Sequence, residues 1–349
     1  MKCIKFLVFI CLFLSGLLFM NAFTSGPFVA SRAQAADLPA FIQLATNPSG
    51  GLLNAIGNGL AKMITEKCPF EVKLRLQTYG FPVVVNSGAA QLALNNSVDS
   101  YQAIKGLEAY RGKPQKKIRI AAVAPQFASA FMVKNDSDIR SVTDLKGKKV
   151  AGKFTNQPPA YFDGVAALAA VGMKWEDLSV IPVSSVKEGN QVLIQGNSVA
   201  TILAVGSALV QEANVAIKGG IRFLSIPGDP ESAKKMWDAV PGYVPLPVKK
   251  GFAVGITGDT ILTSKSLYLI TSQDTNPEII YEVSKALWNH METLYTVHPI
   301  FKRWTKDCMT EPNITIPYHE GAIRFLKEVQ KWTPEMEKGQ ESALKAGGA

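Results

Sequence analysis

Three short turns rich in small and polar residues stand directly before helical patterns. The turns carry Asn47, Ser49, Gly50 and Gly51; then Thr78, Tyr79, Gly80 and Phe81; then Lys153, Thr155, Asn156 and Gln157. Each turn follows a stretch with the apolar or alternating pattern of a β-strand. The start of a helix exposes unpaired backbone N–H groups and about half a positive charge, so it attracts anions and hydrogen-bond acceptors. The chemistry that these turns indicate is therefore the binding of a carboxylate or a similar anion.

Side chains that could catalyse a reaction are few. The three histidines, His290, His298 and His319, have no zinc-type spacing to one another or to a cysteine. His319 stands at the start of a helical pattern, where a capping or packing residue is expected. The segment 106–114 departs from a phosphate-binding loop, because five residues separate its glycines and Pro114 stands where Ser or Thr would bind magnesium. We expect a binding protein rather than an enzyme, with no metal and no cofactor.

The elements that must position the turns alternate between strands and helices. Strands are predicted at 41–45, 70–76, 118–123, 130–133, 150–151, 180–183, 199–203, 221–225, 251–256 and 266–271. Apolar residues at helical spacing predict helices at 52–64, from 83 to about 94, and at 160–171, 280–294 and 321–331. This alternation predicts an α/β fold with a parallel sheet, in which ligands bind at the carboxyl ends of the strands, where the three turns lie.

The first 36 residues have the pattern of a secretory signal peptide. Lys2 and Lys5 precede the apolar run 6–20, and Ala33-Gln34-Ala35 forms a cleavage site of the A-x-A type. We expect cleavage after Ala35 or Ala36; the alternative is an uncleaved anchor. Cleavage removes three basic residues and no acidic residue, so the net charge falls from +9 to +6. This weak positive charge favours anionic ligands only slightly.

The composition also limits the partners and the covalent links. The 349 residues suffice for two domains with a substantial core. The basic residues are scattered and do not alternate with aromatic residues, so no nucleic-acid partner is expected. Two cysteines, Cys68 and Cys308, remain after cleavage. In an exported protein they could form a disulfide, or each could be a buried thiol, and the sequence leaves both alternatives open.

Four motifs resemble the TAXI receptors, the solute-binding subunits of one class of TRAP transporters. They are Ser49-Gly50-Gly51 after the first strand, Thr78-Tyr79-Gly80 after the second, the DLKGKKV block at 144–150, and PYHEGAIRFLKE at 317–328. The DLKGK block is common to many binding proteins, whereas the C-terminal block is much more specific. The resemblance extends in order along essentially the whole mature chain.

The resemblance implies a two-lobed periplasmic-binding-protein fold of class II type. A signal peptide of residues 1–36 would be followed by lobe I (37–131 and 256–349) and lobe II (132–255), with the ligand in the cleft between them. It also implies a monomer in the periplasm that delivers its ligand to a TRAP-type permease driven by an ion gradient. A sensory protein that presents its ligand to a histidine kinase or a chemoreceptor is the main alternative, and a periplasmic enzyme or a ligand-free scaffold are others.

The chain departs from the TAXI pattern at its turns. Leu52 and Leu53 follow the first glycine pair where many members have Tyr, and the third turn runs into Pro158 and Pro159. Proline has no N–H, so this turn either loses donors or merely places proline at the first helical position, where little is lost.

From these departures we expect a small organic acid with an apolar or aromatic portion. Tyr79, Phe81, Phe127 and Tyr161 would pack against it, although each could instead be a core residue, and Lys153 either supplies a cation or is a solvated strand end. The expected ligand-binding residues are Asn47, Ser49, Gly50, Gly51, Thr78, Tyr79, Gly80, Phe81, Gln126, Phe127, Lys153, Thr155, Asn156, Gln157, Tyr161 and Gly206.

Overall fold

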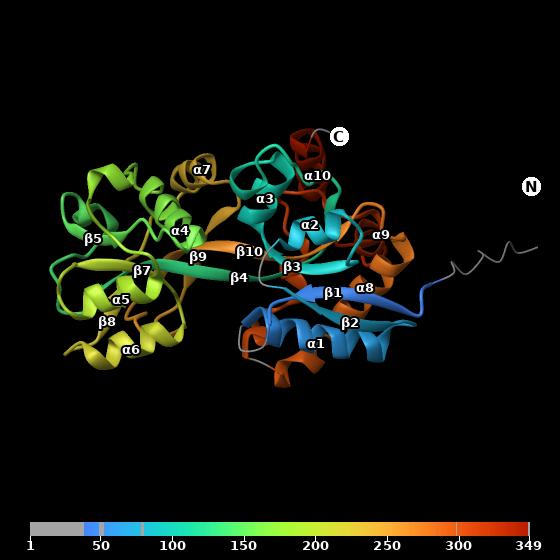
Figure 1. Cartoon of the computed structure of the whole chain (residues 1–349), viewed down its shortest axis with the longest axis horizontal. Coiled ribbons are helices and arrows are strands. Elements are labelled where there is room, and N and C mark those ends of the chain that lie inside the picture. The colour runs from blue at the N-terminus through green and yellow to red at the C-terminus, as the bar shows by residue number, and fades with distance from the viewer. Residues whose placement is uncertain (1–37, 49–51, 78–79, 298, 348–349) are drawn as a thin grey trace, which may run out of the picture. The chain divides into compact units, whose positions relative to one another are not determined.

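Two long strands, β4 (Ile118–Lys134) and β10 (Thr260–Ser272), pair antiparallel along the middle of the sheet (Figure 1). The computed structural model describes residues 38–48, 52–77, 80–297 and 299–347. The predicted signal peptide and Ser49, Gly50, Gly51, Thr78 and Tyr79 therefore lie outside the described residues. The sheet has ten strands, of which eight follow the order β2-β1-β3-β10-β4-β7-β5-β6, while β8 pairs with β4 and β9 with β10.

The strands at the two ends of this order are parallel. β1 pairs parallel with β2 and β3, and β5 pairs parallel with β6 and β7. The remaining strands are β1 (Phe41–Thr46), β2 (Glu71–Leu76), β3 (Leu92–Asn96), β5 (Lys149–Gly152), β6 (Ser179–Pro182), β7 (Ala200–Ala204), β8 (Ile221–Phe223) and β9 (Tyr243–Val248). Helices follow the parallel strands, which places the ends of β1, β2 and β3 beside the starts of α1, α2 and α3. This order was predicted for the first two units, but the helix predicted to reach about residue 94 is wrong, because α2 ends at Asn86 and β3 begins at Leu92.

The α-helices cover the faces of the sheet (Figure 1). They are α1 (Leu52–Lys67), α2 (Phe81–Asn86), α3 (Ser97–Lys105), α4 (Pro158–Ala169), α5 (Val186–Ile194), α6 (Ala208–Ala216), α7 (Pro230–Ala239), α8 (Pro277–His290), α9 (Glu320–Glu328) and α10 (Pro334–Gly347). His319 caps α9, because its Nδ1 accepts a hydrogen bond from the Gly321 N–H at 3.1 Å.

The buried apolar residues gather into two regions, which we call the first and second lobes. The core of the first lobe contains β1, β3, α1, α8 and the 118–124 part of β4. The core of the second lobe contains β5, α4, β7, β8 and the 130–133 part of β4. Between these cores, the middle of β4 at Gln126 and Phe127 is only partly buried. The lobe boundaries predicted from the sequence stay a prediction.

Two strand predictions are wrong. The segments 118–123 and 130–133 are one strand, β4, which continues through Pro125. The register between β4 and β10 shifts between Lys265 and Leu267, and such a bulge tolerates a proline, which has no N–H to donate to the ladder. The segment 251–256 forms turns instead of a strand, and Gly255 there has a left-handed φ of 85°.

Cys68 and Cys308 are free in this structure. The Cys68 Sγ lies 3.6 Å from the Glu282 carbonyl oxygen, and the Cys308 Sγ lies 3.4 Å from the Arg303 carbonyl oxygen. Burial raises the pKa of Cys68 to about 12. Of the two alternatives, the structure therefore favours two separate thiols.

Helix α4 is fixed to the second lobe by a contact that only glycine permits. Trp175 stacks on Tyr161, with ring centroids 5.9 Å apart, and meets Phe131 edge-on. Gly164 lies under the same indole, where a Cβ atom would be 2.0 Å from Cζ2 of Trp175. This packing holds the first turn of α4 against the lobe.

We predict that Gly164→Ala destabilises the protein by about 1–3 kcal/mol, because the added methyl overpacks the core. Helix propensity alone would favour Ala by about 1 kcal/mol. Chemical denaturation measures the difference. In a Trp175→Leu background the clash is removed, so the same substitution is expected to be neutral or stabilising there. A Gly164→Ala variant more stable than wild type in the presence of Trp175 would contradict this packing.

Candidate functional site

The starts of four helices line one cavity of about 570 Å³. Leu53 comes from the first turn of α1, Phe81 from α2, Asn96 and Asp99 from the start of α3, and Pro159 from α4. A second cavity of about 250 Å³ shares Asn96, Asp99, Ala109, Pro159 and Lys265 with the first. We call the two cavities together the cleft. Because α1 to α3 belong to the first lobe and α4 to the second, the cleft lies between the lobes.

The floor of the cleft comes from the middle of the two long strands. Phe127 of β4 and Lys265 and Leu267 of β10 line it. The apolar wall is formed by Leu53, Phe81, Phe127 and Leu267. A cavity of several hundred cubic ångströms with mainly apolar walls and a few polar groups is typical of small-molecule sites.

Lys265 is the one lysine or arginine that lines the cleft among the described residues, and it is almost buried, with 9% of its surface exposed. Its Nζ donates to the Asp163 Oδ1 at 2.6 Å and to the Tyr243 hydroxyl oxygen at 3.1 Å. The Tyr243 hydroxyl in turn donates to the Asp163 Oδ1 at 2.6 Å. Burial and the neighbouring Asp163 carboxylate raise the pKa of Tyr243, so this tyrosine stays neutral. The cluster joins β10, α4 and β9.

Asp99 is a partly buried acidic side chain that lines the cleft. Its Oδ2 accepts a hydrogen bond from the Tyr110 hydroxyl at 2.9 Å. Burial raises the pKa of Asp99 above its ordinary value, and the hydrogen bonds from Tyr110 and Asn95 only partly oppose this shift. Among the described residues, no lysine or arginine forms an ion pair with it. Asp99 therefore takes up a proton more readily than an exposed carboxylate.

The third turn donates its hydrogen bonds to the protein itself. The N–H groups of Thr155, Asn156 and Gln157 donate to the carbonyl oxygens of Val183, Ser184 and Phe154 at 3.2, 2.9 and 2.8 Å. Pro158 and Pro159 occupy the start of α4 and have no N–H. Both readings of the prolines thus apply: they stand at the favoured helical position, and the turn has few donors to offer a ligand.

The structure brings together some of the residues expected to bind the ligand. Asn47, Gly80, Phe81 and Phe127 line the cleft. The other described members of the predicted set do not line it: Gln126, Lys153, Thr155, Asn156, Gln157, Tyr161 and Gly206. Lys153 is exposed at a left-handed φ of 69°, and Tyr161 packs on Trp175. The five members at 49–51 and 78–79 lie outside the described residues.

The cleft residues that sequence reasoning missed include three with polar side chains, Asn96, Asp99 and Lys265. Asn96 ends a buried strand and caps α3 through a hydrogen bond from the Asp99 N–H at 2.9 Å. The sequence LALNNSVDS carries the signal, because an apolar run followed by Asn-x-x-Asp is typical of a helix start. Lys265 is a lone lysine inside an apolar strand, where burial with a partner is expected.

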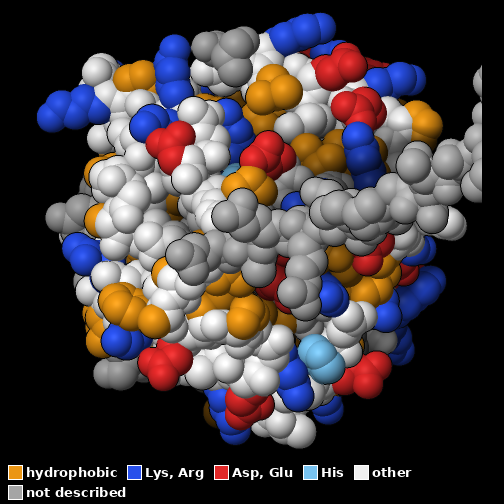
Figure 2. Space-filling view, turned by 90° about the vertical axis from the view of Figure 1, so that its right-hand side faces the viewer, with side chains coloured by type: hydrophobic (Ala, Val, Ile, Leu, Met, Phe, Trp, Pro, Cys, Tyr) orange, Lys and Arg blue, Asp and Glu red, His pale blue; other side chains and the backbone are white. Residues whose placement is uncertain are grey.

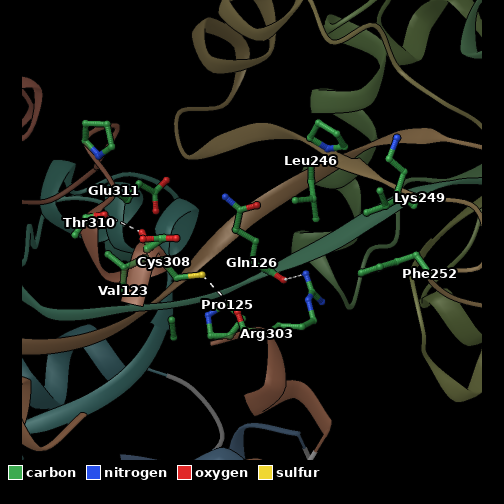
Figure 3. A pocket seen from close by; sticks show the side chains of 15 residues that line it. Val123, Pro125, Gln126, Leu246, Lys249, Phe252, Arg303, Cys308, Thr310 and Glu311 are labelled. Atoms are coloured by element: carbon green, nitrogen blue, oxygen red, sulfur yellow. Dashed lines mark hydrogen bonds between the residues drawn. The ribbon is translucent and has the colours of Figure 1, made fainter. Parts of the chain in front are cut away.

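A separate cavity of about 630 Å³ lies on the opposite face of β4, and we call it the rear cavity (Figure 3). Gln126 lines it, whereas the next residue, Phe127, lines the cleft. On β10, Lys265 and Leu267 line the cleft, whereas the hydroxyl of Ser266 between them donates to Glu311, which lines the rear cavity. Because successive side chains of a strand point to opposite faces, the two cavities lie on either side of the sheet.

No group of three His, Cys, Asp or Glu side chains within the described residues could hold a metal ion. None of the helices in the described part of the chain has both the length and the hydropathy needed to cross a bilayer. On the face shown in Figure 2, Lys and Arg side chains are interspersed with Asp and Glu and form no continuous basic patch.

Comparisons with known proteins agree with this architecture. A family model described as the NMT1-like family matches residues 44–329. A TctC solute-binding protein from Polaromonas, solved without ligand, superposes with a TM-score of 0.52 at 15% identity, covering 88% of this chain and 97% of that one. The aliphatic sulphonate binding protein SsuA from Escherichia coli has a TM-score of 0.45 at 15% identity, covering 88% of this chain and 100% of that one. The superposition on the TctC solute-binding protein confirms the predicted two-lobed periplasmic-binding-protein fold.

We predict that Asp163→Asn lowers the free energy of unfolding by about 3 kcal/mol, because it leaves the Lys265 ammonium buried without its carboxylate. The double variant Asp163→Asn with Lys265→Met should be more stable than the single variant, since it removes the unpaired charge. Asp238→Asn is the matched control, because it breaks only the exposed pair with Lys234 and should change stability little. Equal losses in the single and double variants, measured by chemical denaturation, would contradict the account of the cluster.

Proposed function

Because this chain belongs to the NMT1-like family, we propose that it is an extracytoplasmic solute receptor of the TAXI type. It captures a small organic acid with an apolar portion in the cleft and delivers it to a TRAP-type permease. The observation that carries the proposal is the cleft itself: both lobes line it, its wall is apolar, and one buried cation lies on its floor.

The apolar part of the ligand follows from the wall of the cleft. Micromolar affinity requires about 8 kcal/mol, and a hydrogen bond to a charged group contributes roughly 1.5–3 kcal/mol. The third turn offers few free donors, so polar contacts leave a deficit after the cost of association is met. Contact with Leu53, Phe81, Phe127 and Leu267 supplies the remainder.

An acidic group on the ligand is supported by the Lys265 ammonium and by the raised pKa of Asp99. Lys265 can exchange one of its hydrogen bonds with Asp163 or Tyr243 for a ligand carboxylate. Asp99 would repel that carboxylate when ionised, but its raised pKa lets it take up a proton more readily than an exposed carboxylate, and the protonated form donates a hydrogen bond instead. The cleft therefore accepts an anion best when Asp99 is protonated.

The permease, the periplasmic location and the monomeric state come from the resemblance of the motifs to TAXI receptors. A sensory role would use the same cleft with a membrane histidine kinase or chemoreceptor as partner. A permease gene adjacent to the gene for this chain supports the transport role, and a kinase gene in that place supports the sensory role.

The ligand class is tested by a thermal-shift screen of the mature protein against aliphatic, dicarboxylic, keto and aryl acids and amino acids. A ligand at one hundred times its dissociation constant stabilises the protein by about 2.7 kcal/mol, which corresponds to a rise in Tm of a few degrees. We expect acids with an apolar portion to give the largest shifts. A screen in which folded, ligand-free protein responds to none of them would contradict the proposal.

For the best acid of the screen, we predict that affinity rises as the pH is lowered from about 8 toward the ordinary pKa of a carboxylic acid, because the raised pKa of Asp99 lets it take up a proton before a typical carboxylic acid does. Asp99→Asn should bind the acid more tightly at the upper end of this range and lose the pH dependence. Glu108→Gln, which removes an exposed carboxylate of the cleft, is the control and should retain it. Weaker binding by Asp99→Asn at every pH, measured by calorimetry, would instead indicate a ligand that carries an amine at this position.

A further inference from the structure

The rear cavity contains a cation with no acidic partner. Arg303 is the last residue of η5 (Pro299–Arg303). Its Nη2 donates to the Gln126 carbonyl oxygen at 3.0 Å (Figure 3). The guanidinium carbon lies 5.1 Å from the centroid of the Phe252 ring. Among the described residues, no Asp or Glu forms an ion pair with Arg303. Burial lowers the pKa of Arg303 below its ordinary value, but a guanidinium keeps its proton in proteins, so the side chain is charged.

The surroundings of Arg303 are largely apolar. Pro125 of β4, Leu246 and Val248 of β9, and Phe252 line the same cavity. A guanidinium has five N–H donors, and among the described residues the hydrogen bond to the Gln126 carbonyl uses one of them. The cavity thus combines an apolar wall with several free donors that carry one positive charge. Its volume of about 630 Å³ lies within the usual range for small-molecule sites.

We propose that the rear cavity is a second binding site, for a small amphiphilic monoanion. The anionic group, a carboxylate or a sulfonate, pairs with Arg303, and the apolar body packs against Leu246, Val248 and Phe252. Arginine presents its donors in a planar fork that matches the two oxygens of such a group.

The acidic residues of the cavity do not prevent this binding. Glu311 lines the cavity at the side of η6 (Lys306–Thr310), and its carboxylate is held by the Ser266 hydroxyl at 2.6 Å. Burial raises the pKa of Glu311 to about 7, so it is neutral for much of the time near neutral pH. Asp307 is exposed, where its charge is screened. Lys249, also of this cavity, is paired with Asp259 at 2.7 Å and adds little net charge.

The rear site is independent of the proposed function of the cleft. The two cavities lie on opposite faces of β4, and the described lining residues of one do not occur in the other. The rear cavity is nevertheless lined by both lobes, since Val248 belongs to the core of the second lobe and Cys308 packs against that of the first.

The test uses calorimetry of the mature protein with 1-naphthoate as the probe and its neutral amide, 1-naphthamide, as the matched ligand. We expect a binding event with naphthoate that Arg303→Gln weakens at least tenfold and that Arg303→Lys partly restores. The amide should bind at least tenfold more weakly than naphthoate. Lys249→Gln, which removes the paired lysine of the same cavity, should leave the affinity within about twofold.

Two further variants separate the rear site from the cleft and from a folding defect. Phe81→Ala alters the cleft wall and should leave the Arg303-dependent event intact. Leu246→Asp places a carboxylate in the apolar wall, retains Arg303, and should abolish the event. The proposal is overturned if naphthoate does not bind at millimolar concentration, or if every binding event survives in an Arg303→Gln protein whose melting temperature shows that it is folded.

Discussion

The antiparallel pairing of β4 with β10 is the constraint on which the rest of the structure depends. These strands run from the core of one lobe to that of the other, so their register fixes what lies between the lobes. Alternation along β10 places successive side chains on opposite faces of the sheet. Phe127, Lys265 and Leu267 line the cleft, while Gln126 lines the rear cavity and Ser266 binds Glu311 there. A slip of one residue would exchange the two sets.

The buried cation follows from that register. A lysine in the middle of β10 cannot reach water freely, so it requires a partner, and Asp163 of α4 provides one at 2.6 Å. The packing of Gly164 under Trp175 fixes α4, and hence Asp163, against the second lobe. The ion pair therefore joins the strand pair to the second lobe at the floor of the cleft. A ligand carboxylate at Lys265 would compete with the existing ion pair to Asp163. On the proposed function, the cation alone therefore does not give strong anion binding, and the apolar wall must contribute to affinity.

Much of the fold follows from local sequence patterns, because the apolar periodicity that marks each strand-turn-helix unit lies within a short segment of the chain. The starts of α1, α2 and α4 were predicted for this reason, and two of these turns place Asn47, Gly80 and Phe81 at the cleft. The length of β4 was not predictable, since Pro125 reads as a strand end and only the bulge opposite it permits the strand to continue.

The polar part of the site was harder to predict. The third turn has the composition of an anion site, but its Thr155 and Asn156 N–H groups donate to the segment after β6, which only the tertiary structure reveals. Lys265 lies more than one hundred residues from the predicted turns, and its role depends on the pairing of β10 with β4. Asn96 and Asp99 did carry a local signal, the pattern of a helix cap after a buried strand. A fourth turn could therefore have been added to the predicted site from the sequence alone.

The central claim is that the ligand binds between the lobes, where the four helix starts meet. A crystal structure of the mature protein with the strongest acid from the ligand screen tests it most directly. The account predicts density for the acid beside Phe81 and Phe127, with its carboxylate within hydrogen-bond distance of the Lys265 Nζ. Density for the acid outside the cleft, with the cleft filled only by water, would contradict it.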